Sequence, residues 1–214
     1  MHLLRVELPS RPGSLGVVAS AMGRVDVDII AVEVLETLGE RAVDDFIVSV
    51  PPGMMMDTLV SACDELEGVK VLWVSRYPES WGIQGDIELL DAMLDDPGRA
   101  LDILVSEAPE VFHCQWAAVV DHQSGTLGPL GAQAPELDAA ALASFGPLDR
   151  PHAVTLPAQW LPHWSETLVA VAPIDERRSL LLGRAGGPVF LASERHRLEH
   201  LAALSCLPAR HPRG

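Results

Sequence analysis

The first 77 residues alternate strand and helix patterns in an order that few folds accommodate. In the strand-like stretches apolar residues stand at every second position, and in the helical stretches they stand three and four positions apart. The order is strand, helix, strand, strand, helix, strand. The strand patterns cover residues 4–8, 30–34, 46–50 and 69–73, and the helical patterns cover residues 15–22 and 56–66.

This order predicts a βαββαβ unit, the split βαβ arrangement of ferredoxin-like folds, with a four-stranded antiparallel sheet and both helices on one face. The periodicity then breaks, which predicts a linker at residues 78–85. Beyond the linker, helical and strand patterns mix again in residues 86–207, and residues 208–214 read as a tail. We therefore expect an α+β chain with one domain at residues 1–77 and a second at 86–207.

The chain is acidic, with 30 acidic against 15 basic residues and a net charge of −15. Such a field repels nucleic-acid backbones and anionic lipid, so neither is expected as a partner without a basic patch, and the sequence has none. Apolar runs reach only about half a dozen residues, against roughly 20 for a membrane span. Cys63, Cys114 and Cys206 are isolated, which argues against a disulfide framework and favours a cytoplasmic protein.

The junction between the first strand and the first helix has the features of an anion site. It runs from Leu8 to Gly16 and contains Gly13, whose missing side chain lets a ligand approach the backbone. The first turn of a helix also has unpaired N–H groups, which favour a carboxylate. A plain structural turn that binds nothing would show the same pattern.

Residues 1–77 resemble an ACT domain, a small amino-acid-sensing module of enzymes in amino-acid metabolism. The family's first signature, a polar residue followed by Arg-Pro-Gly-x-Leu, is matched by Ser10 to Leu15. Its second signature, Gly-hydrophobic-Asn-Ile at the start of the second strand, is matched by Asp26 to Ile29. Here Ser10 replaces the common Asp, Asp26 the common Gly, and Asp28 the common Asn.

The resemblance implies a side-by-side homodimer that binds a free amino acid between the two subunits. The carboxylate of this effector would meet the first loop of one subunit, and the ammonium group would face the start of the second strand in the other. By position, the ammonium contact is Asp28, whose carboxylate accepts hydrogen bonds and adds charge attraction. The loop residues implied are Ser10, Arg11, Gly13, Ser14 and Leu15.

Residues 86–207 resemble a GAF-like domain, an antiparallel sheet with helices on its outer faces that serves as a sensing or dimerisation module. The similarity rests on the closing pattern, in which the strand at Leu180 runs into a Gly-rich segment and Ser193 is expected to cap the last helix. Residues 128–162 match nothing in that family, so the resemblance assigns no binding residues here.

No catalytic, cofactor or metal site emerges from the motifs. Gly183 to Pro188 lacks the Lys-Ser/Thr of a phosphate loop, so we predict a plain loop. His196 to His200 matches the HxxEH pattern of inverted zinc peptidases. However, the apolar stripe of that helix leaves both histidines facing solvent, and a catalytic zinc needs a third ligand.

We therefore expect a non-catalytic regulatory homodimer that binds a free amino acid and signals to its second domain or to a partner enzyme or regulator. One alternative is an enzyme whose site lies in the second domain, where Asp121, His152 or His163 would converge on one cavity. Another is an interaction scaffold whose ACT-like site is empty.

Overall fold

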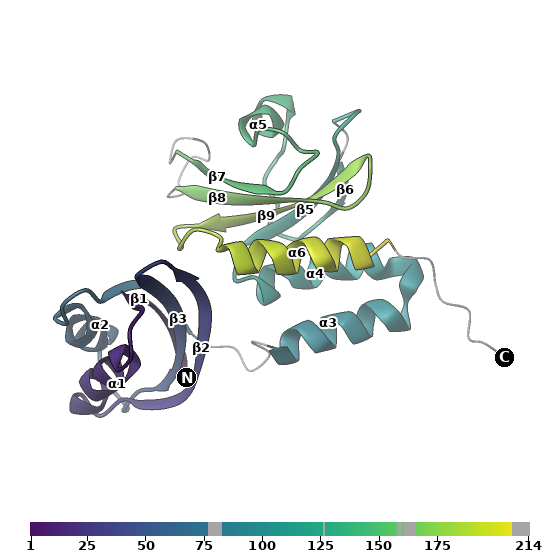
Figure 1. Cartoon of the computed structure of the whole chain (residues 1–214). Coiled ribbons are helices and arrows are strands. Elements are labelled where there is room, and N and C mark those ends of the chain that lie inside the picture. The colour runs from purple at the N-terminus through teal and green to yellow at the C-terminus, as the bar shows by residue number, and fades with distance from the viewer. Residues whose placement is uncertain (77–82, 126, 158–159, 161–165, 207–214) are drawn as a thin grey trace. The chain divides into compact units, whose positions relative to one another are not determined.

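The computed structural model describes residues 1–76, 83–125, 127–157, 160 and 166–206 (Figure 1). The chain divides into two compact units, Met1–Glu79 and Ser80–Gly214. Each unit contains one antiparallel sheet, and the described residues form six α-helices. The predicted α+β class is therefore confirmed.

In the first unit, two helices cover one face of a four-stranded sheet (Figure 1). The strand order across the sheet is β2-β3-β1-β4, and every neighbouring pair is antiparallel. The elements are β1 (His2–Pro9), α1 (Ser14–Arg24), β2 (Asp28–Leu38), β3 (Arg41–Ser49), α2 (Met56–Asp64) and β4 (Lys70–Arg76).

The core of this unit lies between the sheet and the two helices. Leu4 of β1 stands opposite Phe46 of β3, and both side chains are buried on the helix side. The alternation of β1 places Arg5 on the other face, where its Nε and Nη2 donate to the two carboxylate oxygens of Asp45 at 2.8 and 2.9 Å. The two faces of the sheet therefore differ in chemistry: the face toward the helices is mostly apolar, and the other contains a buried ion pair.

Strand β2 forms an edge of the sheet and is mostly exposed. Its only strand neighbour among the described residues is β3. The side chains of Ile30, Val32 and Val34 are 54%, 41% and 57% exposed. An edge with free N–H and C=O groups and exposed apolar side chains is a ready template for pairing with another strand.

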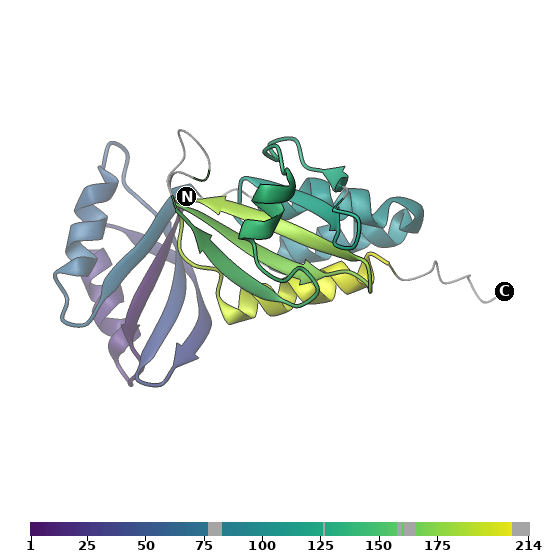
Figure 2. The ribbon, with the colours of Figure 1, turned by 90° about the horizontal axis from the view of Figure 1, so that it is seen from above.

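In the second unit, a five-stranded antiparallel sheet has the order β6-β5-β9-β8-β7. Helices α4 and α6 lie on one face, and α5 lies on the other (Figure 2). The elements are α3 (Ile83–Asp95), a 3-10 turn (Pro97–Arg99), α4 (Ala100–Val111), β5 (Trp116–Asp121), β6 (Leu127–Leu130), α5 (Ala139–Ser144), β7 (His152–Leu156), β8 (Thr167–Pro173), β9 (Arg178–Ala185) and α6 (Ala192–Leu204).

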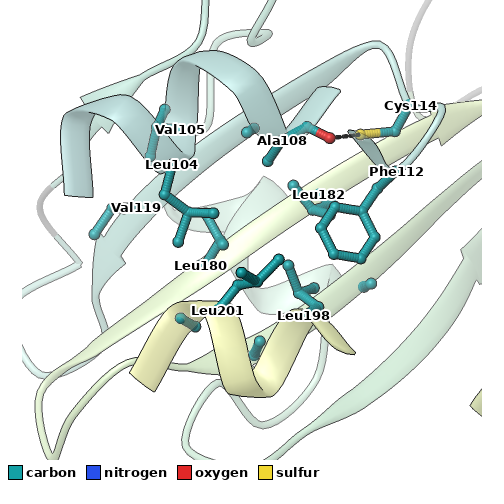
Figure 3. Close-up of a cluster of buried hydrophobic side chains, with 14 of the residues drawn as sticks. Leu104, Val105, Ala108, Phe112, Cys114, Val119, Leu180, Leu182, Leu198 and Leu201 are labelled. Carbon is teal, nitrogen blue, oxygen red and sulfur yellow. Dashed lines mark hydrogen bonds between the residues drawn. The ribbon is translucent and has the colours of Figure 1, made fainter. Parts of the chain in front are cut away.

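The larger core of this unit joins α4, α6 and the sheet (Figure 3). Leu104 of α4, Leu180 of β9 and Leu201 of α6 all point into it. Cys114 borders the same cluster, and its thiol lies 3.9 Å from the carbonyl oxygen of Ala108. Burial raises the pKa of the Cys114 thiol to about 12, which keeps it in the unreactive protonated form.

The division between the two units, at Glu79 and Ser80, falls within the linker predicted at 78–85, and α3 already begins at Ile83 with Gly85 buried inside it. The predicted start of the last helix is wrong. Ser193 does not cap the last helix; the N-cap is Leu191, whose N–H donates to the Glu194 carboxylate at 2.8 Å. The predicted tail at 208–214 lies outside the described residues.

Candidate functional site

A groove in the first unit lies between the β1–α1 loop and the β2–β3 hairpin. Its volume is about 370 Å3. All five loop residues singled out from the sequence border it, namely Ser10, Arg11, Gly13, Ser14 and Leu15. The hairpin contributes Val34, Thr37, Ala42 and Asp44, and the remaining lining residues are Leu8, Pro9 and Pro12.

The loop presents the N-terminus of α1 to this groove. Gly13 immediately precedes the helix with φ of 92°, a left-handed conformation that favours glycine. A Cβ atom built on Gly13 would meet no atom within 4 Å, so the space beside its backbone is open. Among the described residues no side chain caps the helix, and the Ser14 N–H donates to the carbonyl oxygen of Arg11 at 3.2 Å. Because the first N–H groups of a helix have no acceptor within it, this end of the groove attracts anions.

The hairpin side of the groove contains a buried acid, Asp44. In the register of the sheet, Asp44 stands opposite Val6 of β1 and Val34 of β2, on the helix side. The residue is only 2% exposed, and its Oδ1 is buried with no hydrogen-bond partner among the described residues. Burial raises the pKa of the Asp44 carboxyl above its ordinary value, and the charge of neighbouring Asp45 raises it further.

Sequence reasoning did not single out Asp44, although its signal was present. Ala42, Asp44, Phe46 and Val48 occupy alternate positions of β3 and share one face. Three of these residues are apolar and buried, so the acid stands at a core position. A carboxylate in an otherwise apolar alternation is a signal worth following, since buried charges are normally paired.

Asp28 does not border the groove of its own chain. It lies exposed at the first position of β2, after Asp26 in a left-handed turn with φ of 58°. The contact predicted between Asp28 and the loop would therefore have to come from a second subunit.

The enzyme alternative named three residues in the second unit, and His163 lies outside the described residues. The Asp121 carboxylate accepts N–H groups of Gln123 and Ser124 at 3.0 and 2.9 Å, which holds its pKa down at about 2. Both ring nitrogens of His152 lie within 3.0 Å of backbone carbonyl oxygens. The side chains of Asp121 and His152 therefore both form hydrogen bonds with backbone groups.

A wider hollow of about 610 Å3 lies beside the α5 region, bordered by His122, Asp149 and Glu176 among others. His122 Nε2 lies 2.9 Å from the backbone oxygen of Glu176. On α6, the exposed rings of His196 and His200 have centroids 5.5 Å apart. Within the described ranges, no three His, Cys, Asp or Glu side chains gather in a way that could hold a metal ion.

The Gly-rich segment after β9 closes around its own arginine. Arg184 is 1% exposed, and its Nη2 donates to Glu194 at 2.9 Å. Its Nη1 donates to the carbonyl oxygen of Pro188 at 2.9 Å, and its guanidinium lies 4.1 Å from the centre of the Phe190 ring. The backbone of this segment thus encloses a protein cation and offers no phosphate cradle.

Comparisons with known proteins give no family. No family model matches the chain, and no curated protein matches it. Among solved structures, the chain is similar to one described as the crystal structure of an unknown protein from Galdieria sulphuraria. The two share 15% sequence identity over 94% of this chain and 90% of that chain, with a TM-score of 0.30, so the likeness carries no argument. Of the helices that the structure describes, none has the length and apolarity to span a membrane.

Proposed function

We propose that this chain is a non-catalytic regulatory protein that binds a free amino acid in the groove beside Gly13, within an ACT-type homodimer. The observation that carries the proposal is this groove, where an uncapped helix N-terminus and a buried carboxylate border one space of about 370 Å3. An α-amino acid has one group of each complementary charge. The strand order β2-β3-β1-β4, with both helices on one face, supports a ferredoxin-like, ACT-like first unit.

The free edge of β2 supports the dimer. If two β2 strands pair antiparallel about an axis near Glu33, the middle of the strand, position 28 of one stands opposite position 38 of the other. Asp28 of the partner subunit would then be one residue away from Thr37, which borders the groove, but on the face of the sheet that Leu38 shares, away from the helices. The same pairing of β2 strands would cover the side chains of Ile30 and Val32, which are exposed in the single subunit.

In this proposal the second unit receives the signal. Its five-stranded antiparallel sheet, with α4 and α6 on one face and α5 on the other, supports the GAF-like assignment. A bound amino acid can shift the equilibrium between two arrangements of the dimer only if it binds one arrangement more tightly than the other. Binding at the groove would shift that balance, and the second unit or a partner enzyme or regulator would respond.

Calorimetric titration of the full chain with each of the twenty L-amino acids is expected to give saturable binding for at least one. The double variant Gly13→Trp, Asp28→Ala is expected to abolish it, because a residue other than glycine is strained at φ of 92° and an indole would occupy the open space. Asp91→Asn, on the exposed side of α3, is the matched control and should bind as the wild type does. Absence of binding by every amino acid, or undiminished binding by the double variant, would contradict the proposal.

A charge at the β2 edge is expected to separate the subunits. Val32→Lys places an ammonium group at the proposed strand pairing, and edge lysines oppose such pairing. Sedimentation equilibrium should show a dimer for the wild type and a monomer for the variant. Leu94→Lys, at an exposed apolar position of α3 in the second unit, serves as the control. A monomeric wild type would refute the dimer, and a dimer that binds no amino acid would favour an interaction scaffold instead.

A further inference from the structure

We propose that Asp44 is the group that binds the ammonium of the amino acid, so that the groove of a single subunit holds both ends of the zwitterion. This inference rests on the proposed function and deepens it. It assigns to β3 of the same chain a role that the resemblance gave to Asp28 of the partner subunit.

The position of Asp44 suits this role. Asp44 and the loop around Gly13 border the same groove, the acid from the hairpin and the amides from the start of α1. The N–H groups of a helix start favour a carboxylate. A carboxylate such as that of Asp44 favours a cation with several N–H donors. A ligand that carries both groups on one carbon atom, as an α-amino acid does, offers a partner to each side of the groove.

One carboxylate oxygen of Asp44 is unsatisfied in the part of the fold that the structure describes. Its Oδ1 is buried, and the described residues give it no hydrogen-bond donor. Buried polar atoms almost always have a partner, and an unpaired one is costly. The next residue shows the usual solution, because Asp45 on the opposite face is held by two hydrogen bonds from Arg5. A ligand ammonium would supply to Asp44 the donors that the fold does not.

The charges and the apolar lining of the groove together limit the chemical class of the ligand. An anion without an amino group would bring its charge beside the Asp44 carboxylate, and a simple amine would leave the helix amides unused. Much of the remaining lining is apolar and includes Leu8, Leu15 and Val34. This lining favours an α-amino acid with an uncharged side chain.

An unpaired buried acid should also reduce the stability of the empty protein. Asp44→Asn keeps the shape of the side chain but removes the charge, so the variant without ligand is expected to melt a few degrees above the wild type at pH 7. Functional groups held at the expense of stability typically behave in this way. A purely structural Asp44 would give the opposite sign, because its loss would lower the melting temperature.

The test is calorimetry at pH 7 with the amino acid that binds the wild type most tightly, its 2-hydroxy acid and its decarboxylated amine. Asp44→Asn is expected to weaken binding of the amino acid by roughly 10- to 100-fold, since a hydrogen bond to a charged group is lost. Asp28→Asn should change the affinity for the amino acid less than about threefold, because an exposed charge contributes little to binding. The wild type should prefer the amino acid over its hydroxy acid, and Asp44→Asn should lose that preference.

Each outcome has a defined meaning. If the wild type binds and Asp44→Asn binds equally well, or if Asp44→Asn melts below the wild type, the inference is overturned while the proposed function stands. If Asp28→Asn alone shows the loss, the ammonium site belongs to the partner subunit and the inference is again overturned. If no amino acid binds the wild type, both proposals fall. A loss confined to Asp44→Asn, together with its raised melting temperature, supports the inference.

Discussion

Arg184→Met is expected to destabilise the second unit by about 3–5 kcal/mol, the usual cost of leaving one member of a buried ion pair alone. Arg184 and Glu194 are 1% and 6% exposed. Besides Glu194, the guanidinium donates to the carbonyl oxygens of Phe112 and His113 at 2.6 and 3.1 Å. One side chain therefore joins the end of α4, β9 and the first turn of α6, and its loss leaves a buried carboxylate without its cation.

Urea denaturation of the full chain, followed by circular dichroism and by tryptophan fluorescence, measures this loss. Arg177→Met is the control, because Arg177 is 62% exposed and its pair with Asp121 should barely move the transition. Adding Glu194→Gln to Arg184→Met should recover part of the stability, since the amide keeps the shape without the charge. If Arg184→Met shifts the urea unfolding transition as little as Arg177→Met does, the role given to Arg184 is contradicted.

Gly183→Ala is expected to cost about 3 kcal/mol, near the upper end for overpacking a core. Gly183 stands directly opposite Trp116 in the β5–β9 pair, and Trp116 is fully buried. A Cβ atom at position 183 would lie 1.8 Å from Cε2 and 2.1 Å from Nε1 of the indole. The glycine is therefore required by the close approach of the ring.

A double-mutant cycle tests this contact. In a Trp116→Leu background, Gly183→Ala should cost less than about 1 kcal/mol, because the colliding ring is gone. Gly128→Ala is the matched control on β6, where the nearest atom to an added Cβ is a Val119 methyl carbon at 3.3 Å. Equal costs of Gly183→Ala in both backgrounds would show that the indole is not the cause.

The last helix begins earlier than its local sequence indicates. Ser193 reads as a helix cap, yet the helix starts two residues earlier because Glu194, held by Arg184, accepts the N–H of Leu191. Here a contact between distant segments overrides a local preference, as tertiary packing often does. Gly85 reads locally as a helix breaker, yet it is buried inside α3.

Local sequence patterns were enough to predict the α+β class, the strand and helix elements of the first 76 residues, and the loop that borders the groove. These follow from period and turn chemistry, which act between near neighbours in the chain. The packing of distant segments places Asp44 in the groove with this loop, leaves its Oδ1 without a hydrogen-bond partner among the described residues, and buries Arg184 against Glu194. Whether a charge is satisfied depends on which distant segments pack around it, and no local pattern contains that information.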